Sequence, residues 1–243
     1  MVGVRRGLAA CIVGAGALLA ALDVGPAAWC VGLVCAVVLA VAAGRRAAVD
    51  GVVAFGPADL VTLTRATLAC VVAGLVAEVF AGRDDVGTLV TITEVALVLD
   101  FVDGRVARRT GTASTYGGRL DGEADAFLIL VLSVLVARDH GAWVLGLGLV
   151  RYAYAVAERL LPWMQRPLPP RYWRKVVAAY VGIALTLAAS GLAPAATTYG
   201  VLVVAALLLA ESFGWDVVWL WRRRLNRAGA ADVLPAKVLE HGR

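Results

Sequence analysis

The chain has 243 residues, 61% of them hydrophobic, with a formal net charge of +5 and a mean hydropathy of +0.81. Soluble domains are usually about 45–50% apolar, so this composition excludes an ordinary soluble protein. Apolar runs of about 17–25 residues predict membrane-spanning helices. We expect the first run to be a retained helix rather than a cleaved signal peptide. In chain order, the eight expected spans are 7–22, 27–43, 60–80, 86–102, 121–137, 141–158, 175–192 and 197–220.

The basic residues predict how these spans are oriented. When Arg5 and Arg6 are placed in the cytoplasm, only Arg83 and Arg138 among the loop arginines fall on the outer side. This asymmetry follows the positive-inside rule. The sequence therefore predicts a multi-pass cell-membrane protein whose basic residues line one membrane surface, where they attract anionic lipid. It does not indicate a nucleic-acid partner.

The stretch between the fourth and fifth spans carries four carboxylates at helical spacings. It reads Asp100-x-x-Asp103-Gly104-x-x-Ala107-Arg108, then eight residues, then Gly117-x-x-x-Asp121-x-x-x-Asp125. Each pair of acids shares one helix face, and charge beside lipid is costly enough to indicate a functional site. Oxygen-only ligands favour a hard cation, Mg²⁺ or alternatively Mn²⁺ or Ca²⁺, and four carboxylates are enough for two ions. The small residues Gly104, Ala107 and Gly117 leave the helix backbone open to a bulky ligand or to another helix. The planar guanidinium of Arg108 suits a phosphate.

This arrangement resembles the signature of the CDP-alcohol phosphotransferase (CDP-alcohol phosphatidyltransferase) family, and all eight signature positions are filled. The resemblance implies an all-α integral membrane protein with a six-helix core. Here the core corresponds to residues 58–227. Two extra transmembrane helices precede it within residues 1–57, and residues 228–243 form a polar tail.

The resemblance also implies a function and a role for each motif residue. The function is phospholipid synthesis: an alcohol hydroxyl attacks the β-phosphorus of a CDP-linked donor, expected to be CDP-diacylglycerol, and CMP leaves. Asp125 acts as the general base, and the enzyme is a homodimer. Two Mg²⁺ ions, with Mn²⁺ as the alternative, are held by Asp100, Asp103, Asp121 and Asp125. The CDP moiety is surrounded by Gly104, Ala107, Arg108 and Gly117.

One segment departs from the family pattern. Many members carry Pro-Asn before the first core helix and an Arg six residues after the Asn. Here Asp59 follows Pro57-Ala58 where Asn is common, and Arg65 stands in the place of the Arg. An amide-specific contact is therefore in doubt, although an Asp still caps a helix.

The acceptor pocket is less well defined by the sequence. Arg151 lies inside the sixth span, where an Arg usually faces a polar cavity or pairs with a carboxylate. A basic group that includes Arg171, Arg174 and Lys175 opens the seventh helix and suits a phosphorylated polyol such as glycerol 3-phosphate or inositol phosphate. Serine and unphosphorylated polyols remain open. So does the role of Glu211 and Asp216 in the last span, which either pair with an intramembrane Arg or line a second polar surface.

An ion- or proton-coupled transporter is the alternative function, with the acidic cluster as its ion site. Transporters more often place such acids near the bilayer midplane and show repeated halves. Here the acids gather at one end of the helices and the sequence shows no internal repeat. The pattern therefore favours the transferase.

Overall fold

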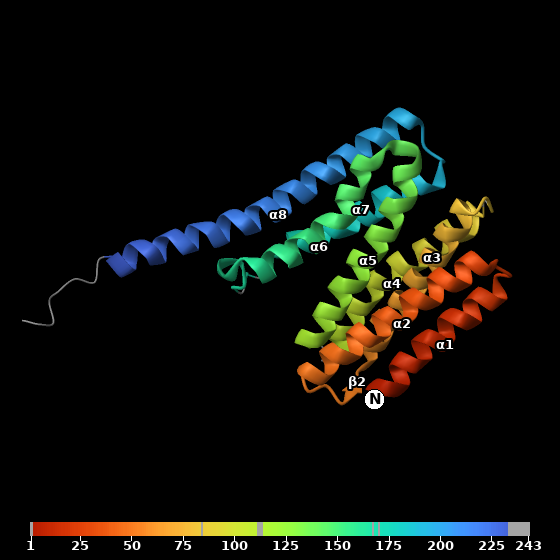
Figure 1. Cartoon of the computed structure of the whole chain (residues 1–243), viewed down its shortest axis with the longest axis horizontal. Coiled ribbons are helices and arrows are strands. Elements are labelled where there is room, and N and C mark those ends of the chain that lie inside the picture. Colours follow the sequence, from red (N-terminus) through yellow and green to blue (C-terminus); the bar gives the residue numbers. More distant parts are fainter. Residues whose placement is uncertain (1, 84, 111–113, 167, 170, 233–243) are drawn as a thin grey trace, which may run out of the picture.

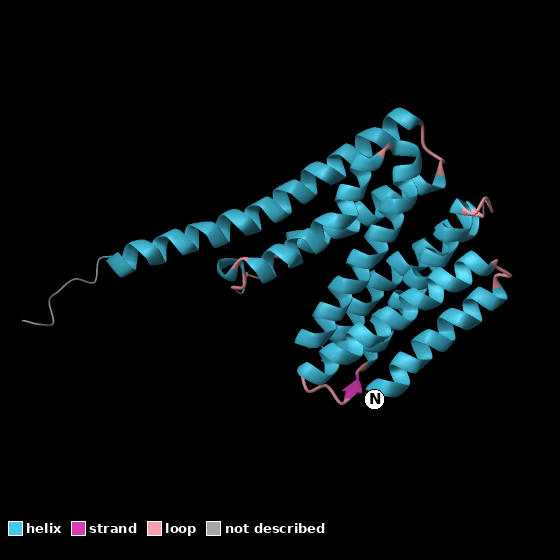
Figure 2. Cartoon of the chain, viewed as in Figure 1, coloured by secondary structure: helices cyan, strands magenta, loops and turns pink. Residues whose placement is uncertain are grey.

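The computed structural model describes residues 2–83, 85–110, 114–166, 168–169 and 171–232, although the side chains of 103–108, 110 and 226–232 are outside the description. This part of the chain is almost entirely helical (Figure 2). Its α-helices are α1 (Val4–Ala21), α2 (Pro26–Val49), α3 (Pro57–Phe80), α4 (Val86–Thr110), α5 (Thr115–His140), α6 (Leu145–Leu160), α7 (Trp173–Ser190) and α8 (Ala195–Asp232). The all-α fold class and the order of the eight helices are as the sequence predicts.

Four of these helices are long and apolar enough to cross a membrane by length and composition, judged on the described residues: α1, α2, α3 and α8. The other four lie where spans are expected but are less apolar or shorter. The acids of the motif lie within α4 and α5 and shorten their apolar runs. The helix α6 has only 16 residues, and α7 begins with a basic turn. The charges that reduce the hydropathy of α4 and α5 are those of the candidate site.

Local signals in the sequence explain where several helices begin. Pro57 occupies the first turn of α3, and the Asp59 carboxylate accepts a hydrogen bond of 2.8 Å from the backbone N–H of Gly56. The expected capping role of Asp59 is thereby confirmed. Ser114 caps α5 by accepting from the N–H of Gly117 at 2.9 Å. Side-chain oxygens at these positions satisfy N–H groups that have no partner within the helix.

Two further helix ends also have local causes in the sequence. At the start of α4, the Thr88 hydroxyl and backbone N–H donate to the Asp85 carboxylate and lower its pKa below the ordinary value. At the end of α7, Gly191 adopts a left-handed conformation with φ of 65°, which favours glycine because it has no Cβ.

The helix α3 lies at the centre of the molecule, packed against α1, α2, α4 and α5. On the far side of α5 lie α6 and α7, and α7 also contacts α4 and α8. The end of α8 extends away from the other helices (Figure 1). A short antiparallel pair of strands, β1 (Val2–Gly3) and β2 (Ala54–Phe55), joins the start of α1 to the segment before α3. The central position of α3 brings its polar residues against α4 and α5.

The N-terminal helices α1 and α2 are attached to α3 by a polar contact and a close approach. The buried Glu78 carboxylate accepts a hydrogen bond of 3.0 Å from the backbone N–H of Ala28, near the start of α2. One turn earlier on α3, a Cβ on Gly74 would lie 2.7 Å from the Ala28 carbonyl oxygen. The bare backbone of Gly74 therefore sets how closely α2 approaches α3.

Replacing Gly74 by Ala is expected to lower the stability of the folded protein by about 1–3 kcal/mol, because α2 has to shift away from α3. The measurement is thermal unfolding of the purified full-length protein in detergent. Gly146→Ala in α6 is the matched control, since a Cβ there meets no atom within 4 Å. If both variants unfold at the same temperature, close packing at Gly74 does not hold α2 in place.

Candidate metal and nucleotide site

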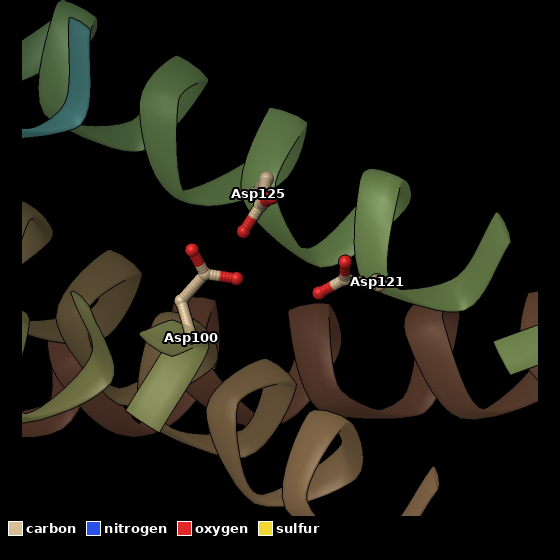
Figure 3. A group of neighbouring side chains, drawn as sticks. All are labelled: Asp100, Asp121 and Asp125. Atoms are coloured by element: carbon tan, nitrogen blue, oxygen red, sulfur yellow. The ribbon is translucent and has the colours of Figure 1, made fainter. Parts of the chain in front are cut away.

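Three carboxylates of the motif converge between two helices. Asp100 comes from α4, and Asp121 and Asp125 come from successive turns of α5 (Figure 3). One oxygen of each lies within 4.8 Å of the others. Their side chains are partly buried, with exposures of 34%, 13% and 27%. The structure thus brings together three of the four expected metal ligands. The expected site residues whose side chains lie outside the described part of the chain are Asp103, Gly104, Ala107 and Arg108.

A buried guanidinium joins these carboxylates. Arg65 of α3 is only 3% exposed, and its Nη1 lies 2.9 Å from Asp100 and 2.5 Å from Asp121. Its Nη2 pairs with Asp125, and its Nε donates to the Ala96 carbonyl of α4 at 3.2 Å. One side chain therefore connects α3, α4 and α5 at the site.

A second, more exposed cation lies beside the same group. The Lys175 ammonium of α7 is 3.5 Å from the second carboxylate oxygen of Asp121, and its side chain is 69% exposed. Three carboxylates converging in one place repel one another unless cations neutralise them. This donor set contains only carboxylate oxygens, the ligands that Mg²⁺ and Mn²⁺ favour, so the residues fit a hard divalent cation.

The motif glycine Gly117 has a structural partner that the sequence pattern does not reveal. A Cβ on Gly117 would lie 2.6 Å from Oδ1 of Asp59, so the start of α5 packs directly against the start of α3. Asp59 is 7% exposed, and this Oδ1 is buried without a hydrogen-bond partner among the described residues. A buried acceptor without a donor is costly, so binding a ligand that reaches this atom with an N–H or O–H group is favoured.

Gly117→Ala is expected to lower the stability of the folded protein by about 1–3 kcal/mol, because the added Cβ displaces Asp59 and disturbs the position of α5. Gly118→Ala is the matched control: the neighbouring glycine has no atom within 4 Å of an added Cβ. Thermal unfolding of the two purified variants in detergent tests this prediction. Equal losses in the two variants would contradict it.

The residues expected to bind the acceptor lie in three different places. Lys175 belongs to the acidic cluster. The other two residues of the basic group pair with α8, Arg171 with Glu211 at 2.8 Å and Arg174 with Asp216 at 2.7 Å. The open question about the acids of the last span is thereby answered: they pair with arginines.

The structure does not bring Arg151 to the acidic cluster. Its guanidinium pairs with Glu123 at 3.1 Å. Glu123 is two residues after Asp121, which turns it about 200° around α5. Arg151 therefore lies on the opposite face of α5 from the three carboxylates.

The motif predicts the acidic ligands but not Arg65, which is the main further residue of this site. The sequence does carry a signal, because an Arg within an apolar span usually faces a polar cavity or a partner. Its partners lie up to 60 residues away in the chain, so spacing alone does not identify them.

One of three comparisons with known proteins gave a match, and it agrees with this site. The comparisons with curated proteins and with solved structures gave no significant match. The family model of CDP-alcohol phosphatidyltransferases matches residues 55–222. The match begins just before α3 and ends within α8, so it includes the three converging carboxylates and leaves out α1 and α2. The chain is an integral membrane protein of the CDP-alcohol phosphatidyltransferase family.

Proposed function

We propose that this protein is a metal-dependent phospholipid synthase that transfers the phosphatidyl group of CDP-diacylglycerol to an alcohol and releases CMP. The observation that carries this proposal is the convergence of Asp100, Asp121 and Asp125 within 4.8 Å in a family of phosphatidyl transferases. Family membership removes the support for the transporter alternative, because the acids belong to a transferase motif.

The converging carboxylates, together with Asp103, are proposed to hold two Mg²⁺ ions, with Mn²⁺ as the alternative. When bound, the metal supplies positive charge that neutralises the diphosphate and the departing CMP. Arg65 supports this assignment, since its buried guanidinium is paired with all three described acids. It keeps the carboxylates close to one another before a metal binds, which lowers the cost of assembling the site.

Asp125 is proposed as the general base. Its carboxylate takes the proton of the acceptor hydroxyl as the hydroxyl oxygen forms a bond to the β-phosphorus. The bond between this phosphorus and the oxygen that bridges it to the α-phosphorus breaks, and CMP leaves with that oxygen. Asp125 is more exposed than Asp121, 27% against 13%, but less than Asp100 at 34%, so its role as the base rests on its place as the last acid of the motif. Proton transfer to a positioned carboxylate contributes about 10²- to 10⁴-fold to such reactions.

The CDP moiety is proposed to lie against Gly104, Ala107, Arg108 and Gly117. Support comes from the buried and unpartnered Oδ1 of Asp59 next to Gly117. A nucleotide brings N–H and O–H donors, such as the cytosine amino group and the ribose hydroxyls, that can satisfy this atom. The carboxylate of Asp59 would then serve where an amide is common in the family.

A phosphorylated polyol such as glycerol 3-phosphate is the proposed acceptor, with Lys175 as the exposed cation beside the acidic cluster. Its ammonium lies 3.5 Å from Asp121 and is open to solvent. Arg171 and Arg174 remain proposed contributors at a greater distance, because each already neutralises an acid of α8. The positive-inside pattern supports an active site facing the cytoplasm, and the family resemblance supports a homodimer.

A CMP-release screen tests the proposal. Purified protein is given CDP-diacylglycerol and Mg²⁺ with one acceptor at a time: glycerol 3-phosphate, inositol phosphate, inositol or serine. We expect release with a phosphorylated polyol and none when the metal is chelated. Release with serine or inositol alone would contradict the acceptor assignment but leave the transferase assignment intact.

A further inference from the structure

A cavity of about 660 Å³ lies between the N-terminal helices and the core, apart from the acidic cluster. On α3 its wall includes Leu63, which is turned about 200° from Arg65, and on α5 it includes Glu123, turned about 200° from Asp121. None of the three converging carboxylates lines it. The cavity is thus on the opposite side of α3 and α5 from the proposed reaction.

One wall of this cavity is apolar. Along α2 it is lined by Ala36, Ala40 and Ala43, which extend over about 10 Å of helix. Leu8 of α1 and Cys70 of α3 complete this surface. Small side chains on neighbouring helices leave an elongated apolar space, and in a membrane protein such a space suits a hydrocarbon chain.

The mouth of the cavity is basic. Arg46 at the end of α2 lies 3.2 Å from Asp50, and Arg119 at the start of α5 lies 3.3 Å from the same carboxylate. Two guanidiniums share one carboxylate, which leaves one positive charge. A phosphodiester carries one negative charge, and the guanidinium fork matches its two free oxygens. Elsewhere on the cavity wall, Arg151 is already neutralised by Glu123, and Glu158 and Arg159 carry one charge of each sign.

We propose that this cavity binds one membrane phospholipid, with its phosphodiester between Arg46 and Arg119 and an acyl chain along Ala36, Ala40 and Ala43. This lipid is separate from the donor and the product, and the proposal does not depend on the transferase assignment. A lipid fits better than a second copy of the chain. A two-fold interface joins the same patch of both copies, so the surplus positive charge of one cavity would face that of the other.

Native mass spectrometry of the purified full-length protein, titrated with dioleoyl phosphatidylglycerol, tests the proposal. The wild type is expected to retain one lipid per chain. Arg46→Gln combined with Arg119→Gln is expected to weaken retention at least about tenfold, because two charge-assisted contacts are lost. Arg45→Gln combined with Arg138→Gln is the matched control: it also removes two positive charges, and Arg45 and Arg138 are exposed and do not line the cavity.

Two further variants locate the lipid. Ala40→Phe fills the apolar part and is expected to abolish retention, whereas Asp125→Asn is expected to leave it unchanged. Equal retention by the Arg46/Arg119 double variant and the Arg45/Arg138 control would overturn the proposal. Loss of the lipid in Asp125→Asn would also overturn it, by placing the lipid at the donor site. Conversion of a dimer to a monomer by Ala40→Phe, without loss of lipid, would assign the cavity to a second copy instead.

Discussion

Asp125→Asn is expected to lower the rate of CMP release by about 10²- to 10⁴-fold or more, because the amide cannot accept the proton of the acceptor hydroxyl. The carboxylate lies where two helices and a buried arginine converge, so a nearly isosteric amide keeps the shape of the site. The measurement is the initial rate of CMP release from CDP-diacylglycerol at saturating acceptor.

The controls separate loss of the base from loss of a metal ligand. Asp100→Asn removes a proposed ligand that is not the base, so raising the Mg²⁺ concentration is expected to restore part of its activity. The same addition is not expected to restore Asp125→Asn. Asp139→Asn, an exposed acid at the other end of α5, controls for charge on the helix. Full recovery of Asp125→Asn at high Mg²⁺ would show that Asp125 is only a ligand.

Arg65→Met is expected to destabilise the metal-free protein by about 3–5 kcal/mol, because a buried ion-pair network loses its cation. Without the guanidinium, Asp100, Asp121 and Asp125 repel one another across α4 and α5. A divalent ion neutralises the same carboxylates, so Mg²⁺ is expected to restore much of the lost stability. The wild type is expected to depend much less on the metal for folding.

Thermal unfolding in chelator and in millimolar Mg²⁺ measures this difference. Arg138→Met is the matched control: Arg138 is 46% exposed and lies 3.9 Å from the exposed Asp139, and exposed pairs contribute about 1 kcal/mol or less. The unfolding temperature of Arg65→Met is expected to lie below that of the wild type in chelator, and Mg²⁺ is expected to reduce this difference. A difference of the same size in both conditions would mean that Arg65 and the metal do not act on the same carboxylates.

Local patterns in the sequence are enough to predict the helices and most of the acidic site. Apolar runs predict where the helices lie, and the 3- and 4-residue spacings place the acids on helix faces. The start of α5 lies six residues earlier than the expected span, because the capped and polar first turns are helical without being apolar.

Contacts between distant segments are not predictable in this way. Arg65 meets acids 35 to 60 residues further along the chain, and Arg174 meets Asp216 across 42 residues. These pairs depend on how α3, α7 and α8 pack against other helices, and the spacing of residues within one helix does not predict that packing. The cavity beside Arg46 has the same origin, since it is formed by residues of five helices.

The most direct measurement of the central claim follows the β-phosphate itself. The purified protein is supplied with CDP-diacylglycerol labelled with ³²P at the β-phosphorus, Mg²⁺ and the acceptor found in the screen. Attack at this phosphorus predicts that the label passes into a new phosphatidyl alcohol while unlabelled CMP accumulates in equal amount, and that Asp125→Asn shows neither product. Label that stays in the donor, or enters phosphatidic acid at the same rate without an acceptor, would contradict the assignment of this site as a phosphatidyl transferase.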